Sequence, residues 1–188
     1  PDAQTQVSAL IRDEVDYLER IPADLVPLLD SNSGAHAEIV SRFGFQAIMR
    51  MNWLQPPFDN VKVRRAVALA IDRSFYAAVV AGDPKLATDC AAMFGCGTPL
   101  ESSAGIPKRD VAAAKALLKE AKVDFSKPIV MLHVANAPGI AALGNVTRQV
   151  LVDLGFKVDM RAMDFQTFAT SRLNTGPVGK GGWNIAHT

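Results

Sequence analysis

The sequence has little of several features that mark specialised classes of protein. Only two of its 188 residues are cysteine and three are histidine, and they do not form the two closely spaced pairs of ligands that a zinc site usually has. An excess of one charge is also lacking, because 20 Lys and Arg offset 19 Asp and Glu to leave a net charge of +1. Nucleic-acid and membrane-surface binding both depend on concentrated positive charge, so this balance argues against either role.

Long hydrophobic runs are absent as well. The longest candidate, Ala66–Ala81, is interrupted by Asp72, Arg73 and Ser74, and a membrane helix needs roughly 20 consecutive apolar residues. Hydrophobic residues make up 49% and charged residues 21% of the chain, which excludes a disordered, collagenous or coiled-coil protein. A chain of this size can bury roughly 70% of its unfolded surface, so it needs no metal to supply a core.

The two cysteines have five residues between them and lie in a glycine-containing segment. Cys90 and Cys96 are accompanied by Gly95 and Gly97, whereas a thioredoxin-type redox centre has two intervening residues. Two free thiols or one local disulfide remain, and the flexible backbone favours the disulfide. Such a bond would contribute roughly 2 kcal/mol and would place the protein outside the reducing cytosol.

Hydrophobic periodicity predicts mainly helices in the first two-thirds of the chain. We expect a helix ending at Ile11, an extended piece at Val15–Ile21 and a helix from Pro22 to Leu29. A half-buried strand is predicted where apolar residues alternate with polar ones, namely at Phe45, Ala47, Met49, Met51 and Trp53. Helices capped by Asn60 and Asp110, and one from Ser74 to Gly82, follow.

The last third predicts strands that alternate with helices. The strands are Pro128–Ala135, Phe156–Ala162 and Trp183–Thr188, and the helices between them carry a stripe from Leu143 to Leu154 and a cap at Asp164. Right-handed crossovers then give a parallel segment of sheet and an α/β fold class. Ligands of such sheets lie beyond the carboxyl ends of the strands, here near Asn136, Met163–Phe165 and the chain end after His187.

Catalytic motifs are not supported. His36, His133 and His187 are far apart without ligand pairing, and the apolar strand around His133 predicts a core histidine. The segment Gly176–Gly181 has two residues between its glycines where a phosphate loop has four, so it predicts a flexible turn. No Gly-x-Ser-x-Gly elbow occurs. We therefore expect no enzyme activity, no cofactor and no metal.

Several segments resemble elements of one known family. Pro56–Arg73 (PPFDNVKVRRAVALAIDR) resembles the signature of the extracellular solute-binding protein family 5, the peptide- and oligopeptide-binding proteins of bacterial ABC importers. Ala9–Asp16 resembles the family's Gly-Glu-(Val/Ile)-Asp step, with Asp13 in place of the usual Gly. Asp110–Ala121 and Leu151–Val158 (LVDLGFKV) resemble two later elements in the same order and spacing.

The resemblance implies one lobe of a type II periplasmic-binding-protein fold, with a mixed sheet and flanking helices. Residues 1–188 would be a single α/β lobe of a two-lobed protein, without the first lobe and the C-terminal return. The implied role is capture of a peptide-like small solute and its delivery to an ABC transporter membrane permease, by a monomer that is periplasmic or extracellular and tethered to the membrane. A free-standing α/β enzyme domain and a ligand-sensing regulatory domain are the alternatives.

The resemblance also implies ligand contacts. These fall on Asn136, Phe165, Arg172 and His187, and we add Trp53 at the end of the predicted strand. Each position has a structural alternative as well: the Phe165 ring can be part of the core, and Arg172 can lie on a solvated helix face.

Overall fold

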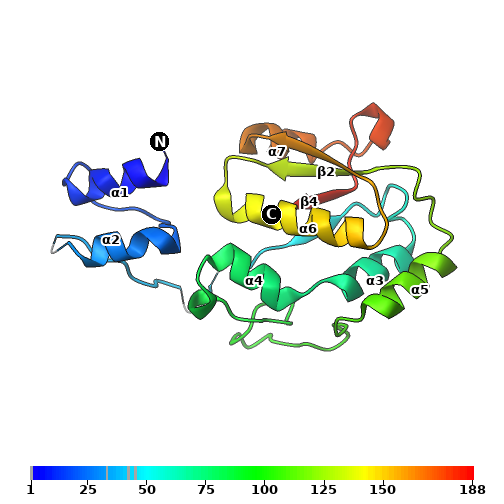
Figure 1. Ribbon diagram of the computed structural model, residues 1–188, viewed down its shortest axis with the longest axis horizontal. Helices are drawn as coiled ribbons and strands as arrows, with labels where there is room; N and C mark the ends of the chain where they lie inside the picture. The colour runs from blue at the N-terminus through cyan, green and yellow to red at the C-terminus, as the bar shows by residue number, and fades with distance from the viewer. Residues whose placement is uncertain (1, 33, 42, 45) are drawn as a thin grey trace.

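The computed structural model describes residues 2–188 except 33, 42 and 45. Its body is a four-stranded sheet with helices on both faces (Figure 1). The strands are β1 Met49–Met51, β2 Ile129–Val134, β3 Val158–Met163 and β4 Ile185–His187, in the spatial order β1-β4-β2-β3. β2 runs parallel to β3 and β4, while β1 runs antiparallel to β4. The predicted α/β class with a mixed sheet is thereby confirmed.

All helices of the body except α6 begin at a side-chain cap. They are α3 Val61–Ala70, α4 Arg73–Ala81, α5 Val111–Glu120, α6 Pro138–Asp153 and α7 Phe165–Ser171. The side chains of Asn60, Asp72, Asp110 and Asp164 each accept a hydrogen bond from a backbone N–H in the first turn, which stabilises a helix start by about 1 kcal/mol. Short turns of 3-10 helix, η2 Pro84–Leu86 and η3 Val178–Lys180, complete this part.

The sheet separates two hydrophobic clusters. On one face, α3, α5 and α6 pack their apolar side chains over Ile129, Met131 and Ile185. On the other, α7 and Trp183 cover Val130, Leu132 and Ala186. All six residues of β2 are buried, as its nearly all-apolar sequence predicts for a strand covered on both faces.

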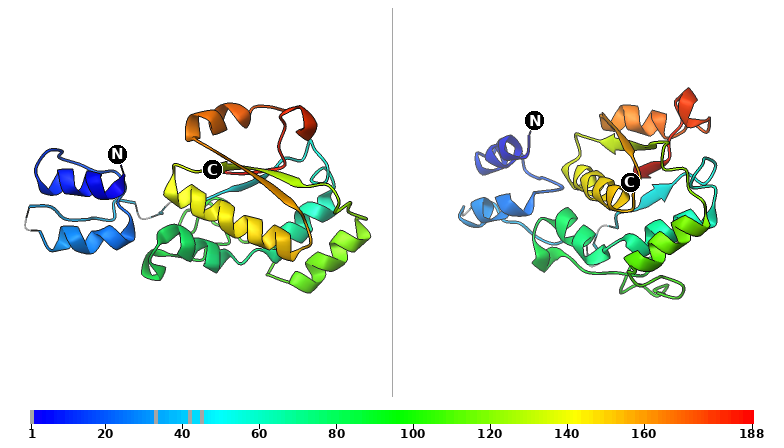
Figure 2. Two further views of the ribbon diagram at one scale, coloured as in Figure 1. Left: turned by 45° about the horizontal axis from the view of Figure 1, so that its top comes forward. Right: turned by 45° about the vertical axis from the view of Figure 1, so that its right-hand side comes forward.

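The N-terminal helices lie apart from this body (Figures 1 and 2). α1 Ala3–Ile11 packs beside η1 Ala23–Leu25 and α2 Val26–Asp30, and each α-helix buries one large side chain, Val7 and Leu29. The extended piece predicted at Val15–Ile21 is a mostly exposed loop that belongs to no described strand.

The first strand is shorter than its alternating sequence predicts. Only Met49–Met51 form β1, although Ile48 and Thr188 extend the pairing with two backbone hydrogen bonds of 2.8 and 3.0 Å. Trp53 lies in the turn beyond the strand and is 66% exposed. Phe45, the first residue of the predicted alternation, lies outside the described residues.

Candidate functional site

The three parallel strands end at the same edge of the sheet. β2 ends at Val134, β3 at Met163 and β4 at His187, and their pairing registers place these ends next to one another. We call this side the carboxyl edge and the opposite side the amino edge. Ligands of open α/β sheets bind outside the carboxyl ends of the strands. The structure thus places the segments after β2 and β3 together, where the sequence predicts a ligand.

Asn136 and Phe165 meet at the carboxyl edge. The Asn136 side-chain oxygen accepts a hydrogen bond of 3.0 Å from the Phe165 backbone N–H, which joins the loop after β2 to the start of α7. Asp164 caps this helix, and its hydrogen bonds from Thr167 hold the pKa of the carboxyl below its usual value. The Phe165 ring remains 52% exposed. An apolar ring beside an exposed amide can contact a ligand that has both apolar and polar groups.

His187 lies at the end of β4, but its side chain points under α6. The ring is 2% exposed, and its Nε2 lies 2.8 Å from the Thr147 hydroxyl, which in turn lies 2.8 Å from the Tyr76 hydroxyl of α4. Burial, followed by the charge of His133, lowers the pKa of His187 to about 4. Burial likewise raises the pKa of Tyr76 to about 12. His187 is therefore neutral at pH 7 and anchors α4 and α6 to the sheet.

Trp53 and Arg172 lie toward the amino edge. Trp53 follows β1, whose end lies beside the start of β4, since the Asn52 N–H donates to the Asn184 carbonyl at 2.8 Å. Arg172 ends α7, and its carbonyl accepts a hydrogen bond of 3.0 Å from the indole N–H of Trp183, just before β4. The structure thus brings Asn136 and Phe165 together. It links Arg172 to Phe165 through the Phe168 ring, whose centroid lies 6.2 Å from that of Phe165 and 5.9 Å from the Arg172 guanidinium carbon. Trp53 lies apart from them. Ligand contacts at all five positions, His187 included, stay predictions.

The disulfide expected from the sequence is present. Cys90 and Cys96 are bonded, with their Cα atoms 5.7 Å apart. The Gln46 side chain donates a hydrogen bond of 3.1 Å to the Ala92 carbonyl, which attaches the disulfide loop to the segment that leads into β1. The tip of the loop leaves Phe94 63% exposed.

Sequence reasoning missed the buried polar residues that hold this architecture. Thr147 occupies a position in the apolar stripe of α6, between Leu143 and Leu151, and a hydroxyl at such a position is a usable signal for a buried partner. Asn52 and Asn184 gave no such signal, because Asn52 contacts the Trp183 carbonyl 131 positions away in sequence.

The described part of the chain holds no group of three or more His, Cys, Asp or Glu side chains placed to bind a metal ion. None of its described helices combines the length and the apolar character needed to cross a membrane.

Comparison with known proteins assigns the chain to a family. The family described as bacterial extracellular solute-binding proteins, family 5 Middle, matches residues 1–186. The chain is 31% identical over 188 residues to the probable peptide ABC transporter periplasmic-binding protein y4tO of Sinorhizobium fredii, covering 98% of this chain and 35% of the relative. It is 32% identical over 171 residues to the probable deoxycholate-binding periplasmic protein YgiS of Escherichia coli, covering 85% and 30%.

The fold agrees with solved structures at low sequence identity. The ABC transporter substrate-binding protein CtaP of Listeria monocytogenes superimposes with a TM-score of 0.76 at 18% identity, covering 100% of this chain and 38% of that one. The chain spans about a third of the length of the curated relatives that it matches. On the match over residues 1–186, this chain belongs to family 5 of the bacterial extracellular solute-binding proteins.

Proposed function

We propose that this chain is one lobe of a solute-binding protein that captures a peptide-like solute and delivers it to the membrane permease of an ABC importer. The family match over residues 1–186 carries the proposal. The nature of the solute rests on the relative named as a peptide ABC transporter periplasmic-binding protein, at 31% identity over 98% of this chain. The protein would work as a monomer in the periplasm or at the outer cell surface, where the Cys90–Cys96 disulfide is stable.

The solute would bind against the carboxyl edge. Phe165 offers a half-exposed ring, and the amide nitrogen of Asn136 makes no hydrogen bond to any described residue. The α1–α2 pair lies on the same side of the body as this edge (Figures 1 and 2). Under the proposal, a second lobe closes over the edge and excludes water from the polar contacts, which strengthens them.

Calorimetry on the full-length protein tests the proposal with a defined panel of peptides, trialanine and glutathione among them. Phe165→Ala is expected to weaken binding about tenfold, because the ring loses its apolar contact with the solute. Lys127→Ala, at the exposed amino edge, is the matched control and should bind as the wild type does. Trp53→Ala and Arg172→Ala test separately whether the solute reaches the amino edge.

The chain 1–188 by itself is expected to bind too weakly to measure. It keeps only one side of the site, and open polar contacts compete with water. The proposal fails if the isolated chain matches the affinity of the full-length protein, or if Phe165→Ala and Lys127→Ala have the same effect.

A further inference from the structure

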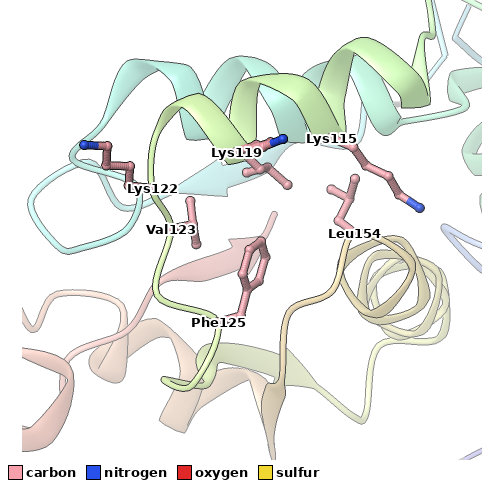
Figure 3. A pocket seen from close by; sticks show the side chains of 7 residues that line it. Lys115, Lys119, Lys122, Val123, Phe125 and Leu154 are labelled. Carbon is pink, nitrogen blue, oxygen red and sulfur yellow. The ribbon is translucent and has the colours of Figure 1, made fainter.

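A cavity of about 390 Å³ opens at the amino edge, away from Asn136 and Phe165 (Figure 3). It lies between α5, the loop that leads to β2, and Leu154 at the end of α6. Its floor is apolar: Leu118 and Leu154 belong to the core and are 1% and 5% exposed. The Phe125 ring completes the floor and packs against Phe156 with ring centroids 5.1 Å apart. Core packing therefore holds this floor in place without a ligand.

The rim of the cavity is basic. Three lysines at spacings of four and three residues share one side of α5 and its end, namely Lys115, Lys119 and Lys122. Figure 3 shows Lys119 above Phe125, with Lys115 near Leu154 and Lys122 at the opposite end of the row, where its side chain points outward. Each ammonium group sits on a flexible stem, so the row can reach an anion at several positions.

The nearby carboxylates are engaged elsewhere. Glu120 of α5 forms an ion pair with Lys62 of α3 at 2.9 Å. Asp124 accepts hydrogen bonds from Ser126 and lies 3.8 Å from Lys127. Asp153, next to Leu154, accepts a hydrogen bond of 2.8 Å from Gln149.

Among the described residues, none of the three rim lysines forms an ion pair. The rim therefore carries local positive charge in a chain whose net charge is only +1.

We propose that this cavity binds a small amphiphilic anion, of the class of medium-chain carboxylates. The carboxylate would pair with the lysine rim, and the alkyl chain would lie against the half-buried side chains of Val123 and Phe125. The volume falls in the range of small-molecule sites, which start at roughly 300 Å³. Both parts of the lining are needed for this ligand: the apolar floor favours its alkyl chain, and the charged rim favours its carboxylate. The site is distinct from the solute site at the carboxyl edge and does not depend on it.

Decanoate, below its micellar concentration, is the probe, and the intact protein is titrated by NMR with labelled methyl groups. Shifts are expected at Leu118, Val123 and Leu154. Each CH₂ group removed from the probe should weaken binding about two- to fourfold. Decanol, which lacks the charge, and acetate, which lacks the chain, should both bind far more weakly. Added salt should weaken decanoate binding, because the rim is open to solvent.

Two triple variants with the same net charge distinguish binding at this site from non-specific attraction of the anion to surface lysines. Lys115→Gln/Lys119→Gln/Lys122→Gln is expected to weaken decanoate binding about tenfold. The control variant removes three exposed lysines that do not line the cavity, and should bind as the wild type does: Lys85→Gln/Lys108→Gln/Lys180→Gln.

Several results would overturn the proposal. Equal binding by both triple variants, or equal binding of decanol, would remove the role of the lysine rim. Methyl and amide shifts confined to the carboxyl edge would place decanoate in the solute site. Binding to anionic phospholipid vesicles without binding to monomeric decanoate would make the rim a membrane contact. No binding at all would leave the lysines to stabilise the C-terminal end of α5.

Discussion

Acidification is expected to destabilise the protein through the buried pair His133 and His187. Both rings lie beneath α6, and burial lowers the pKa of each, that of His187 to about 4. Tyr76 and Thr147 are the polar groups that connect α4 and α6 to this pair, and no described carboxylate forms an ion pair with either ring. The His133 Nδ1 is buried without a hydrogen-bond partner among the described residues. Neither imidazolium would have a counter-charge.

The sign and size of the effect follow from the two states of His187. The unfolded chain binds the proton with a pKa of 6.5 and the folded chain with a pKa of about 4, so the unfolded state takes up more protons as the pH falls. The stability is complete above pH 6.5 and is lost between 6.5 and about 4. The full loss is about 3 kcal/mol, of which about 2 kcal/mol is gone by about pH 5. His133 acts in the same direction.

The carboxylates that cap helices do not contribute to the loss of stability in this pH range. Hydrogen bonds lower the pKa values of Asp72 and Asp164 below 3.8, so their contributions are lost only in more acidic solution. A loss of about 2 kcal/mol corresponds to a fall of about 4–8 °C in Tm for a chain of this size.

The assay is chemical denaturation at a series of pH values. His187→Gln keeps an amide within reach of the Thr147 hydroxyl but cannot titrate, so its stability should fall by about 2 kcal/mol less than that of the wild type between about pH 7 and 5. His36→Gln, at an exposed position away from this network, is the matched control variant. An unchanged slope in His187→Gln, or an NMR titration of His187 near its ordinary pKa, would refute the reasoning.

Three further predictions concern stability. Reduction of Cys90–Cys96 should lower the free energy of unfolding by roughly 2 kcal/mol, and intact-mass analysis after alkylation without reductant should find no modified thiol; two alkylated cysteines would contradict the bond. Gly144→Ala would drive a Cβ into the ring of His133 and should cost about 1–2 kcal/mol net; the cost should shrink in a His133→Ala background, and an equal cost in both backgrounds would count against the contact. Asn184→Ala leaves the buried Val130 N–H without its partner and should cost about 2–4 kcal/mol by urea denaturation, whereas a loss below about 0.5 kcal/mol would show that water replaces the amide.

Local features of the fold could be predicted from the sequence. Asn60, Asp110 and Asp164 were predicted as helix caps and act as such, because a cap bonds to a backbone N–H only two or three residues away. The nearly all-apolar run around Met131 and the apolar stripe of α6 likewise identify buried elements, because a hydrophobic pattern is also a local property of the sequence.

Long-range pairing could not be predicted. β1 pairs with β4 across more than 130 positions, and nothing in the sequence of Met49–Met51 gives the direction of that pairing. This direction places Trp53 at the amino edge. The alternation of side chains along a strand predicts that His187 faces the same side of the sheet as Ile185, two positions earlier. Its burial could not be predicted, because this depends on the helix that covers that side.

Because of the strand order, the sheet cannot be completed until its last strand has been synthesised. β4 follows the other three strands in sequence, yet it lies between β1 and β2. Until residues 185–187 leave the ribosome, the nascent chain holds β1 on one side and the β2–β3 pair on the other, each with a bare inner edge. Such edges invite pairing with other chains, so a protein truncated before Asn184 should depend on chaperones and aggregate where the complete chain folds.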